Sequence, residues 1–162
     1  MLPINITELL EQNRIESNRI EYKQGWNPTA IYHTICAFAN DFESLGGGYI
    51  VVGVEEENGM AKRPVLGVPE EQLDKIQQQM VGFNNLFAPY YLPRVSVEEV
   101  DGKNVIVIWA PVGVNRPYSI RMDVTNNNDK REAFYVRSGT SSIVAKGEVW
   151  MNFGIWQAES HS

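Results

Sequence analysis

Three consecutive glycines, Gly46 to Gly48, lead directly into the apolar run Tyr49-Ile-Val-Val-Gly-Val54. The run is rich in β-branched residues and has no charged side chain, which indicates a central strand buried on both faces. Such a strand must lie inside a sheet that other elements cover, and we expect the glycines before it to form a flexible lead. The run is far shorter than the roughly 20 residues that span a bilayer, so we expect no membrane segment.

Four further segments have the alternating or apolar pattern of strands. The clearest signal lies between two of them, where Asp101-Gly102 is typical of a two-residue hairpin turn. A polar loop that contains Asn126-Asn127-Asn128 precedes the last segment. The four predicted strands cover residues 19–23, 95–100, 104–110 and 134–137.

Three segments have helical patterns. A capping box precedes a short predicted helix near residues 6–13. Asn27-Pro28 is a cap followed by Pro at the first helical position, and it predicts a helix that ends at about residue 40. The apolar residues of 69–87 recur at spacings of three and four, which predicts a third helix before Pro89. Residues 149–156 fit either a short helix or an extended tail.

Together these elements predict an α+β fold in which a mixed, twisted sheet of about five strands carries flanking helices. The 162 residues are enough for one domain and too few for two ordinary ones. We therefore expect a single domain over residues 1–162.

Charge and cysteine content narrow the classes of function. The formal net charge is −6, which argues against indiscriminate nucleic-acid binding. Residues 1–101 have a net charge of −8 and residues 102–162 of +2, so one face can still be positive. A single cysteine, Cys36, excludes an internal disulfide and a Cys-rich zinc site, and we expect it to be a small core residue. The N-terminus lacks the pattern of a signal peptide, so we expect a soluble, cytoplasmic protein.

Several common chemistries lack the residues that they need. Gly48 to Gly53 has the spacing of a phosphate-binding loop, but Val54 and Glu55 occupy the positions of the required Lys and Ser or Thr. The two histidines, His33 and His161, are too few for a His-based metal site or a Ser-His-Asp triad. We expect His33 to be a surface or half-buried polar residue.

Two acidic segments could supply a metal site. Glu16 and Glu21 precede or lie in the first predicted strand, and Glu55 and Glu56 follow the central strand. If the segments adjoin, Glu16, Glu21 and Glu55 could surround Mg²⁺ or Mn²⁺. The other interpretation is a solvated acidic turn, with Glu21 paired to a neighbouring basic residue.

The segment Arg137-Ser-Gly-Thr-Ser-Ser142 directly follows a predicted strand. An arginine, several hydroxyl groups and backbone amides around a glycine can together bind phosphate. The other interpretation is an ordinary capped turn. With further basic residues nearby in the sequence, the candidate nucleic-acid contacts are Lys23, Arg116, Arg121, Lys130, Arg131, Arg137, Ser138 and Thr140.

Four ordered pieces of the sequence are similar to the signature of one protein family. They are Glu16 to Lys23, Ile35-Cys-Ala-Phe-Ala-Asn40 with Gly47 to Val54, Val65-Leu-Gly67, and Phe134-Tyr-Val-Arg to Ser142. In this order they resemble the Schlafen AlbA family over residues 16 to 145, which is most of the chain.

This resemblance implies a mixed sheet with flanking helices and a DNA-binding module of a bacterial transcriptional regulator. In that family the domain lies at the N-terminus, ahead of an ATPase-like region and a winged helix. We therefore expect either a short stand-alone protein or the N-terminal part of a longer regulator, and we expect DNA more than RNA as its partner.

Two alternatives to a DNA-binding module remain. In animal Schlafen relatives the same core is an RNA endonuclease that uses two Glu and one Asp. The resemblance carries these positions to Glu16, Glu21 and Glu55 or Glu56, with Mg²⁺ or Mn²⁺ as the implied cofactor. The second alternative is a protein-partner or sensory domain. The resemblance is compatible with a homodimer.

Overall fold

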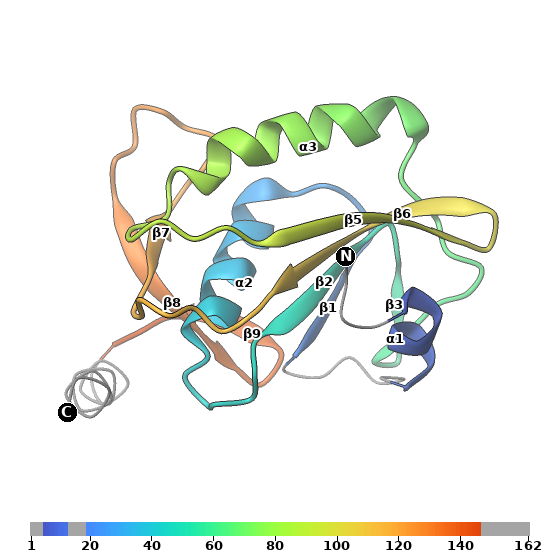
Figure 1. Ribbon diagram of the computed structural model, residues 1–162, viewed down its shortest axis with the longest axis horizontal. Coiled ribbons are helices and arrows are strands. Elements are labelled where there is room, and N and C mark those ends of the chain that lie inside the picture. The colour runs from blue at the N-terminus through green and yellow to red at the C-terminus, as the bar shows by residue number, and fades with distance from the viewer. Residues whose placement is uncertain (1–4, 13–18, 147–162) are drawn as a thin grey trace.

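The computed structural model describes residues 5–12 and 19–146, which are built around a four-stranded sheet (Figure 1). Its strand order is β1-β2-β6-β5, formed by Ile20–Lys23, Gly48–Val52, Lys103–Ala110 and Arg94–Val100. β1 runs parallel to β2, whereas the β2–β6 and β6–β5 pairs are antiparallel. The predicted α+β class with a mixed sheet is therefore confirmed.

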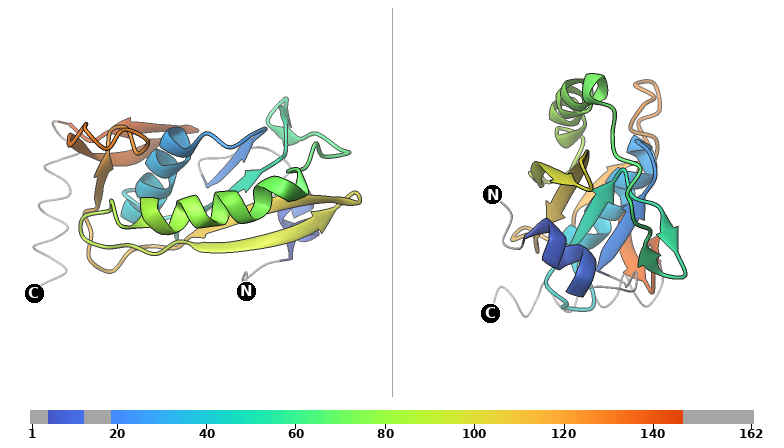
Figure 2. Two further views of the ribbon diagram at one scale, coloured as in Figure 1. Left: turned by 90° about the horizontal axis from the view of Figure 1, so that it is seen from above. Right: turned by 90° about the vertical axis from the view of Figure 1, so that its right-hand side faces the viewer.

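The alternation of side chains along the strands gives this sheet two apolar faces. Ile50 and Val52 of β2 belong to one hydrophobic core, and Val51 belongs to the other. Helices α2 (Pro28–Asn40) and α3 (Glu70–Asn84) contribute to the first core, whereas α1 (Ile6–Gln12) contributes to the second. Figure 2 shows α1 and α3 on opposite sides of the sheet. β2 is thus buried on both faces, as its apolar run predicts.

A second, antiparallel sheet has the order β7-β8-β9, with β7 at Ser119–Arg121, β8 at Glu132–Ser138 and β9 at Ser141–Val144. The strand predicted at 134–137 lies within β8, so it belongs to this sheet, and the mixed sheet has four strands. β7, β9 and the small β3–β4 hairpin (Glu56–Glu57 and Met60–Ala61) were not predicted. With two to four residues each, they are too short to show a clear alternation.

Helix α2 lies between the two sheets, and this position explains its composition. It packs on the face of the mixed sheet that carries Ile50 and Val52, and also against β8 and β9 of the second sheet. Consequently all its residues from Ile31 to Asn40 are buried except His33, which is half-buried. A helix that is apolar on nearly every side is typical of such a buried position.

The predicted helices exist, but their ends differ in detail. Asn5 caps α1 through its side chain, whereas Asn27 occupies the cap position of α2 without a side-chain hydrogen bond. α3 ends at Asn84, whereas the apolar spacing predicted a helix that continues through Phe87 until Pro89. Tighter turns follow, in which the backbone N–H of Leu86 donates to Phe83, and Phe87 remains in the core. Residues 149–156 lie outside the described residues.

The hairpin predicted at Asp101-Gly102 joins β5 and β6. Both turn residues have positive φ, at 54° and 73°, which is the geometry of a type I′ turn. Among the described residues, no helix is long and apolar enough to cross a membrane.

The glycines at the start of β2 serve close packing and are not simply a flexible lead. A Cβ on Gly47 would lie 2.2 Å from the carbonyl oxygen of Ala110, and one on Gly48 would lie 2.5 Å from the Phe38 ring. Gly47 also has a φ of 82°, which favours glycine. These glycines let β2 enter the sheet in direct contact with α2 and with the end of β6.

Asn40, the last residue of α2, connects this helix to the second sheet. Its Oδ1 accepts a hydrogen bond from the backbone N–H of Tyr118 at 2.6 Å. Its Nδ2 donates to the backbone carbonyls of Tyr118 at 3.0 Å and Tyr135 at 2.8 Å. All these groups are buried, so no water can replace the amide without a rearrangement.

We expect Asn40→Ala to lower the free energy of unfolding by about 2–4 kcal/mol, because the substitution leaves several buried backbone groups unpaired. Urea denaturation followed by tryptophan fluorescence measures this loss. Asn127→Ala, at an exposed loop position, is the matched control and should change the stability by less than about 0.5 kcal/mol. A loss below about 1 kcal/mol for Asn40→Ala would contradict this role.

Candidate functional site

Glu21 lies on β1 with its side chain directed toward α2. Its neighbours Ile20 and Tyr22 belong to the core on the α1 side of the sheet. Because successive side chains of a strand alternate, Glu21 faces the opposite side, where its parallel partner Ile50 also lies. The residue is 9% exposed. A carboxylate at this depth needs charged or hydrogen-bonding partners.

Three residues from three different elements contact the same carboxylate oxygen, Oε2 of Glu21. The Thr34 hydroxyl on α2 donates to it at 3.2 Å. Lys23 Nζ lies 3.6 Å away and Arg137 Nη1 on β8 lies 3.7 Å away. Glu21 therefore joins the mixed sheet, the central helix and the second sheet.

Arg137 is itself buried, with 7% of its surface exposed. Its guanidinium lies over the Phe38 ring, with Cζ 4.9 Å from the ring centroid, a favourable arrangement for a cation. Its Nη1 donates to Ser142 Oγ at 3.0 Å, and Ser142 Oγ donates to Thr34 Oγ1 at 3.1 Å. Arg137, Ser142, Thr34 and Glu21 thus form a closed ring of polar contacts, which together with Lys23 we call the polar cluster.

A cleft of about 400 Å³ opens beside the polar cluster. It lies between the first half of α2, the end of β1 and the β8–β9 turn, and hydroxyl groups predominate among its polar side chains. Within the cluster, two cationic side chains face one carboxylate, which leaves an excess of one positive charge next to the opening. The residues that line the cleft are Glu21, Lys23, Ala30, His33, Thr34, Thr140, Ser141 and Ser142.

His33 forms the wall of the cleft on the side of β7. Its ring stacks on Tyr135 with centroids 4.0 Å apart. Burial lowers the pKa of His33, although hydrogen bonds to the backbone act in the opposite direction. In the neutral ring, Nε2 must carry the proton, because it donates to the carbonyl oxygens of Arg121 and Met122 at 3.3 and 3.1 Å. His33 therefore attaches the β7–β8 loop to the rim of the cleft.

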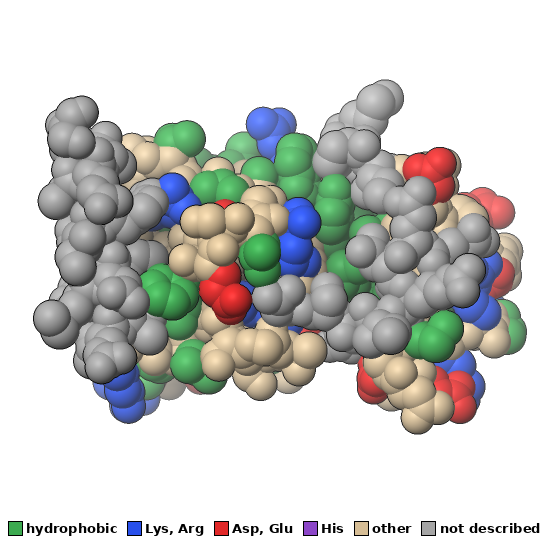
Figure 3. Space-filling model, turned by 90° about the horizontal axis from the view of Figure 1, so that it is seen from below, with side chains coloured by type: hydrophobic (Ala, Val, Ile, Leu, Met, Phe, Trp, Pro, Cys, Tyr) green, Lys and Arg blue, Asp and Glu red, His purple; other side chains and the backbone are tan. Residues whose placement is uncertain are grey.

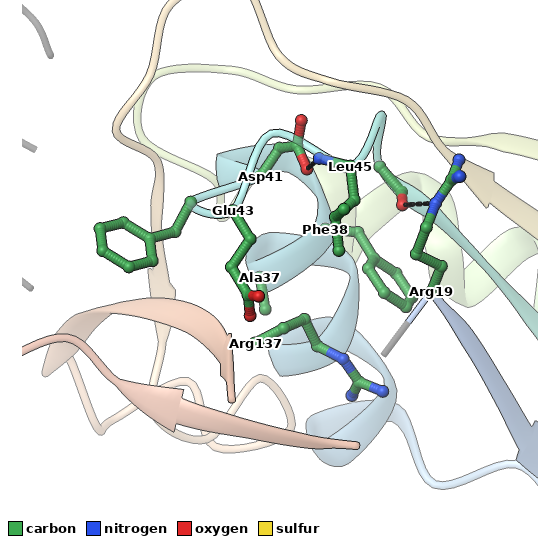
Figure 4. Close-up of a pocket in the computed structure, with 9 residues that line it drawn as sticks. Arg19, Ala37, Phe38, Asp41, Glu43, Leu45 and Arg137 are labelled. Carbon is green, nitrogen blue, oxygen red and sulfur yellow. Dashed lines mark hydrogen bonds between the residues drawn. The ribbon is translucent and has the colours of Figure 1, made fainter. Parts of the chain in front are cut away.

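A second, much smaller pocket lies on the other side of the Phe38 ring (Figure 4). Arg19 and Arg137 lie on either side of this ring, and the Arg19 Nε donates to the Gly47 carbonyl at 3.3 Å. Asp41 turns back onto its own loop, where its carboxylate accepts from the backbone N–H groups of Leu45 and Gly46. These contacts are structural, and they fix the loop between α2 and β2.

Only some of the predicted nucleic-acid contacts lie close together in the structure. Lys23, Arg137 and Thr140 belong to the polar cluster or the cleft, and Ser138 pairs with Ser141 across the base of the same turn. Arg116 lies elsewhere, at the far end of α2, where its Nη1 donates to the Asn40 carbonyl at 3.4 Å.

The other basic residues lie around the β7–β8 loop. Arg121 donates to the Asp129 carbonyl at 3.3 Å, and Arg131 forms an ion pair of 2.8 Å with the Asp129 carboxylate. Lys130 is exposed. On the face shown in Figure 3, the described Lys and Arg side chains are separated by acidic and hydrophobic ones and form no continuous patch.

The predicted carboxylates are placed as follows. Glu21 lines the cleft, whereas Glu55 lies beyond the end of β2 and forms an ion pair of 3.4 Å with Lys62. Glu56 accepts a hydrogen bond from the backbone N–H of Gly59 in the β3–β4 hairpin. Glu16 lies outside the described residues. Within residues 5–12 and 19–146, no three His, Cys, Asp or Glu side chains are grouped so that they could hold a metal ion.

Sequence reasoning missed the part that Thr34 plays in the site. The residue occurs on the apolar face of the predicted helix, three positions after Ile31. A polar residue in a buried stripe is the signal that could have identified it, because such a residue needs a partner from another element.

A family model described as Schlafen, AlbA_2 matches residues 16–146. The chain belongs to this family. The match includes β1, α2 and the β8–β9 hairpin, and therefore every described residue of the polar cluster. The chain matches no curated protein.

Two solved structures share this Schlafen AlbA_2 fold with the chain. One is the N-terminal domain of a RecG-related protein from Nitrosomonas europaea, named for a relationship to an ATP-dependent DNA helicase. It is 25% identical, with a TM-score of 0.56 over 89% of this chain and 91% of that one. The other is the DIP2311 protein from Corynebacterium diphtheriae, 19% identical, with a TM-score of 0.52 over 83% of this chain. This chain covers only 23% of the DIP2311 protein.

We expect the buried pair of Glu21 and Arg137 to be strongly coupled in a double-mutant cycle. Glu21→Gln should lower the free energy of unfolding by about 3 kcal/mol, because it leaves the buried Arg137 guanidinium without its counter-charge. With Arg137→Met as the second substitution, the coupling energy should be about 1–3 kcal/mol.

Urea denaturation of the four proteins measures this coupling. The more exposed pair of Glu55 and Lys62 provides the matched cycle, with Glu55→Gln and Lys62→Met, and its coupling should stay below about 1 kcal/mol. Equal coupling in the two cycles would show that the buried ring does not join the two sheets energetically.

Proposed function

We propose that this Schlafen AlbA_2 domain binds nucleic acid, with DNA as its principal ligand, as a module of a transcriptional regulator. One observation carries the proposal. Two segments that are separated by more than a hundred residues, Glu21 to Lys23 and Arg137 to Ser142, converge on one hydroxyl-lined cleft with an excess positive charge.

The chemistry of the cleft suits a phosphate group. Lys23 supplies an ammonium group at the opening, and the hydroxyls of Thr140 and Ser141 can donate hydrogen bonds to phosphate oxygens. Gly139, with a φ of 62°, gives the tight β8–β9 turn that presents these hydroxyls. Arg137 is buried beneath the cleft and acts as a positioning residue. Its contacts with Ser142 and Glu21 hold the β8–β9 turn against β1.

The proposed binding surface extends from the cleft onto the β7–β8 loop. His33 holds the backbone of this loop at the rim, and Thr29 on α2 donates to the Asp123 carboxylate at 3.2 Å. The exposed Lys130 then provides a second contact for a phosphate further along the strand. Arg121 and Arg131 add positive charge, which Asp129 partly offsets.

The small excess of positive charge around the cleft limits the expected affinity. If Lys23 and Lys130 with one neighbouring cation contact two to three phosphates, the logarithm of affinity should fall with the logarithm of salt with a slope of about −2 to −3. Contacts of this kind set affinity without sequence information. Sequence preference would have to come from other parts of a longer regulator or from DNA shape.

Two further facts support DNA as the ligand and a multi-domain protein as the context of this domain. The similar domain from Nitrosomonas europaea belongs to a protein named for a relationship to a DNA helicase. The similar DIP2311 protein is about four times as long as the matched region.

Glu21 also lines the cleft, and this observation favours the alternative of a metal-dependent ribonuclease. Its carboxylate would bind Mg²⁺ or Mn²⁺ together with Glu16 and with Glu55 or Glu56. Binding of the metal would require Glu21 to exchange its contacts with Lys23 and Arg137, and Glu55 its contact with Lys62.

We expect Lys23→Gln to weaken binding to labelled duplex DNA by about five- to tenfold and to reduce the salt slope by about one, because one phosphate contact is lost. Fluorescence anisotropy across a salt series measures both quantities. Lys75→Gln is the matched control, because Lys75 is exposed on α3, at the top of Figure 1, whereas β9 lies below it. Equal affinities for the two variants would contradict binding at the cleft.

The same assay with an RNA hairpin, in Mn²⁺ or in EDTA, separates the alternatives. Shortening of the hairpin in Mn²⁺ that is lost in Glu21→Gln would establish the ribonuclease in place of the binding module. Neither binding nor cleavage at low salt would leave the protein-partner or sensory domain as the function.

A further inference from the structure

β5 is an edge strand of the mixed sheet with one unpaired side. It pairs with β6 over seven consecutive positions without a bulge, from Arg94 opposite Trp109 to Val100 opposite Lys103. No strand among residues 5–12 and 19–146 pairs with its other side. Regular edges of this kind readily pair with another strand, and proteins normally shield or distort them.

The hairpin turn determines which backbone groups of β5 face outward. In a two-residue hairpin, the pair that closes the turn is hydrogen-bonded, and this pair is Val100 and Lys103. Hydrogen-bonded positions alternate along an antiparallel strand. The N–H and C=O groups that point toward β6 therefore belong to every second residue, namely Val100, Glu98, Ser96 and Arg94. The backbone groups of Val95, Val97 and Glu99 therefore face the open edge.

The side chains along this edge are unusually apolar for an exposed strand. Val95 and Val97 are opposite the buried residues Ile108 and Ile106, so they lie on the same face as the core under α2 and α3. They are nevertheless 37% and 38% exposed. On the other face Arg94 and Glu98 carry opposite charges, and the Ser96 hydroxyl donates to the Glu98 carboxylate.

This order of residues is self-complementary. An antiparallel copy of β5 related by a two-fold axis perpendicular to the sheet pairs residues that lie on the same face. With the axis at Ser96, Val95 is opposite Val97 of the copy, and Arg94 is opposite Glu98 of the copy. The outward backbone groups of the two valines then form four hydrogen bonds across the axis.

The neighbouring register is less favourable. With the axis at Val97, Val95 would be opposite Glu99 of the copy, and Arg94 would be opposite Val100. Both charge pairs are lost in this arrangement, and one contact, Val97 opposite Val97 of the copy, replaces the two valine pairs. The charges and the apolar side chains therefore select the axis at Ser96.

We propose that two copies of this chain associate through their β5 strands, centred on Ser96, to form a continuous eight-stranded sheet. β5 and β1 are at opposite edges of the sheet, so this contact leaves both clefts open and places them at the two far ends of the dimer. The proposal does not depend on nucleic-acid binding. The contact is small, and we expect a dissociation constant on the order of 10 μM.

Sedimentation velocity between about 2 and 200 μM tests the association directly. The mass should rise with concentration from 18.4 kDa toward twice that value. Val97→Lys should keep the protein monomeric at all these concentrations, because it places like charges beside each other at the axis. Val114→Lys is the matched control, since Val114 is 90% exposed outside the sheet, and it should associate like the unchanged protein. Far-UV circular dichroism confirms that each variant is folded.

Charge exchange tests the register. Arg94→Glu alone and Glu98→Arg alone should each weaken association by about tenfold or more, because each creates like-charge pairs across the axis. The double variant Arg94→Glu/Glu98→Arg should restore it. A protein that stays monomeric at 200 μM, or associates equally well with Val97→Lys, would overturn the proposed interface. A double variant that fails to recover would overturn the register at Ser96.

Discussion

The burial of α2 between two sheets is the constraint on which the rest of this structure depends. A helix in that position can bury apolar side chains on nearly every side, but each polar atom on it must find a partner from another element. At its last residue Asn40 bonds to the backbone of the second sheet. At its middle, Thr34 contacts Glu21 on one sheet and Ser142 on the other. The helix therefore connects the two sheets at two separate places.

The polar cluster is better explained by the geometry that it maintains than by net stability. Buried ion pairs lose much of their electrostatic gain to desolvation, and apolar residues of similar volume often stabilise a protein equally well. The ring from Arg137 through Ser142 and Thr34 to Glu21 instead fixes the β8–β9 turn relative to β1. The cleft hydroxyls and Lys23 are thereby held in one arrangement, which is what recognition of a charged ligand requires.

Much of the local structure could be predicted from the sequence, because helices and strands impose their periods on neighbouring residues. The apolar run of β2, the Asp101-Gly102 turn and the spacing of apolar residues in α3 each contain their signal within a few positions. The same is true of the segments around Glu21 and Arg137, whose residue types indicated a polar site. Short strands such as β7 and β9 carried too little pattern to be found.

The sequence by itself thus determined the elements, the mixed sheet around β2 and the segments that carry the polar residues. Only the tertiary structure decided that β8 belongs to a second sheet, that Arg137 is buried against Phe38, and that Thr34 completes the cluster. It also decided that β5 is an edge strand. The physical reason is that these features are contacts between residues far apart in the chain. Local periodicity states which face of an element is apolar, but it does not state which other element covers that face.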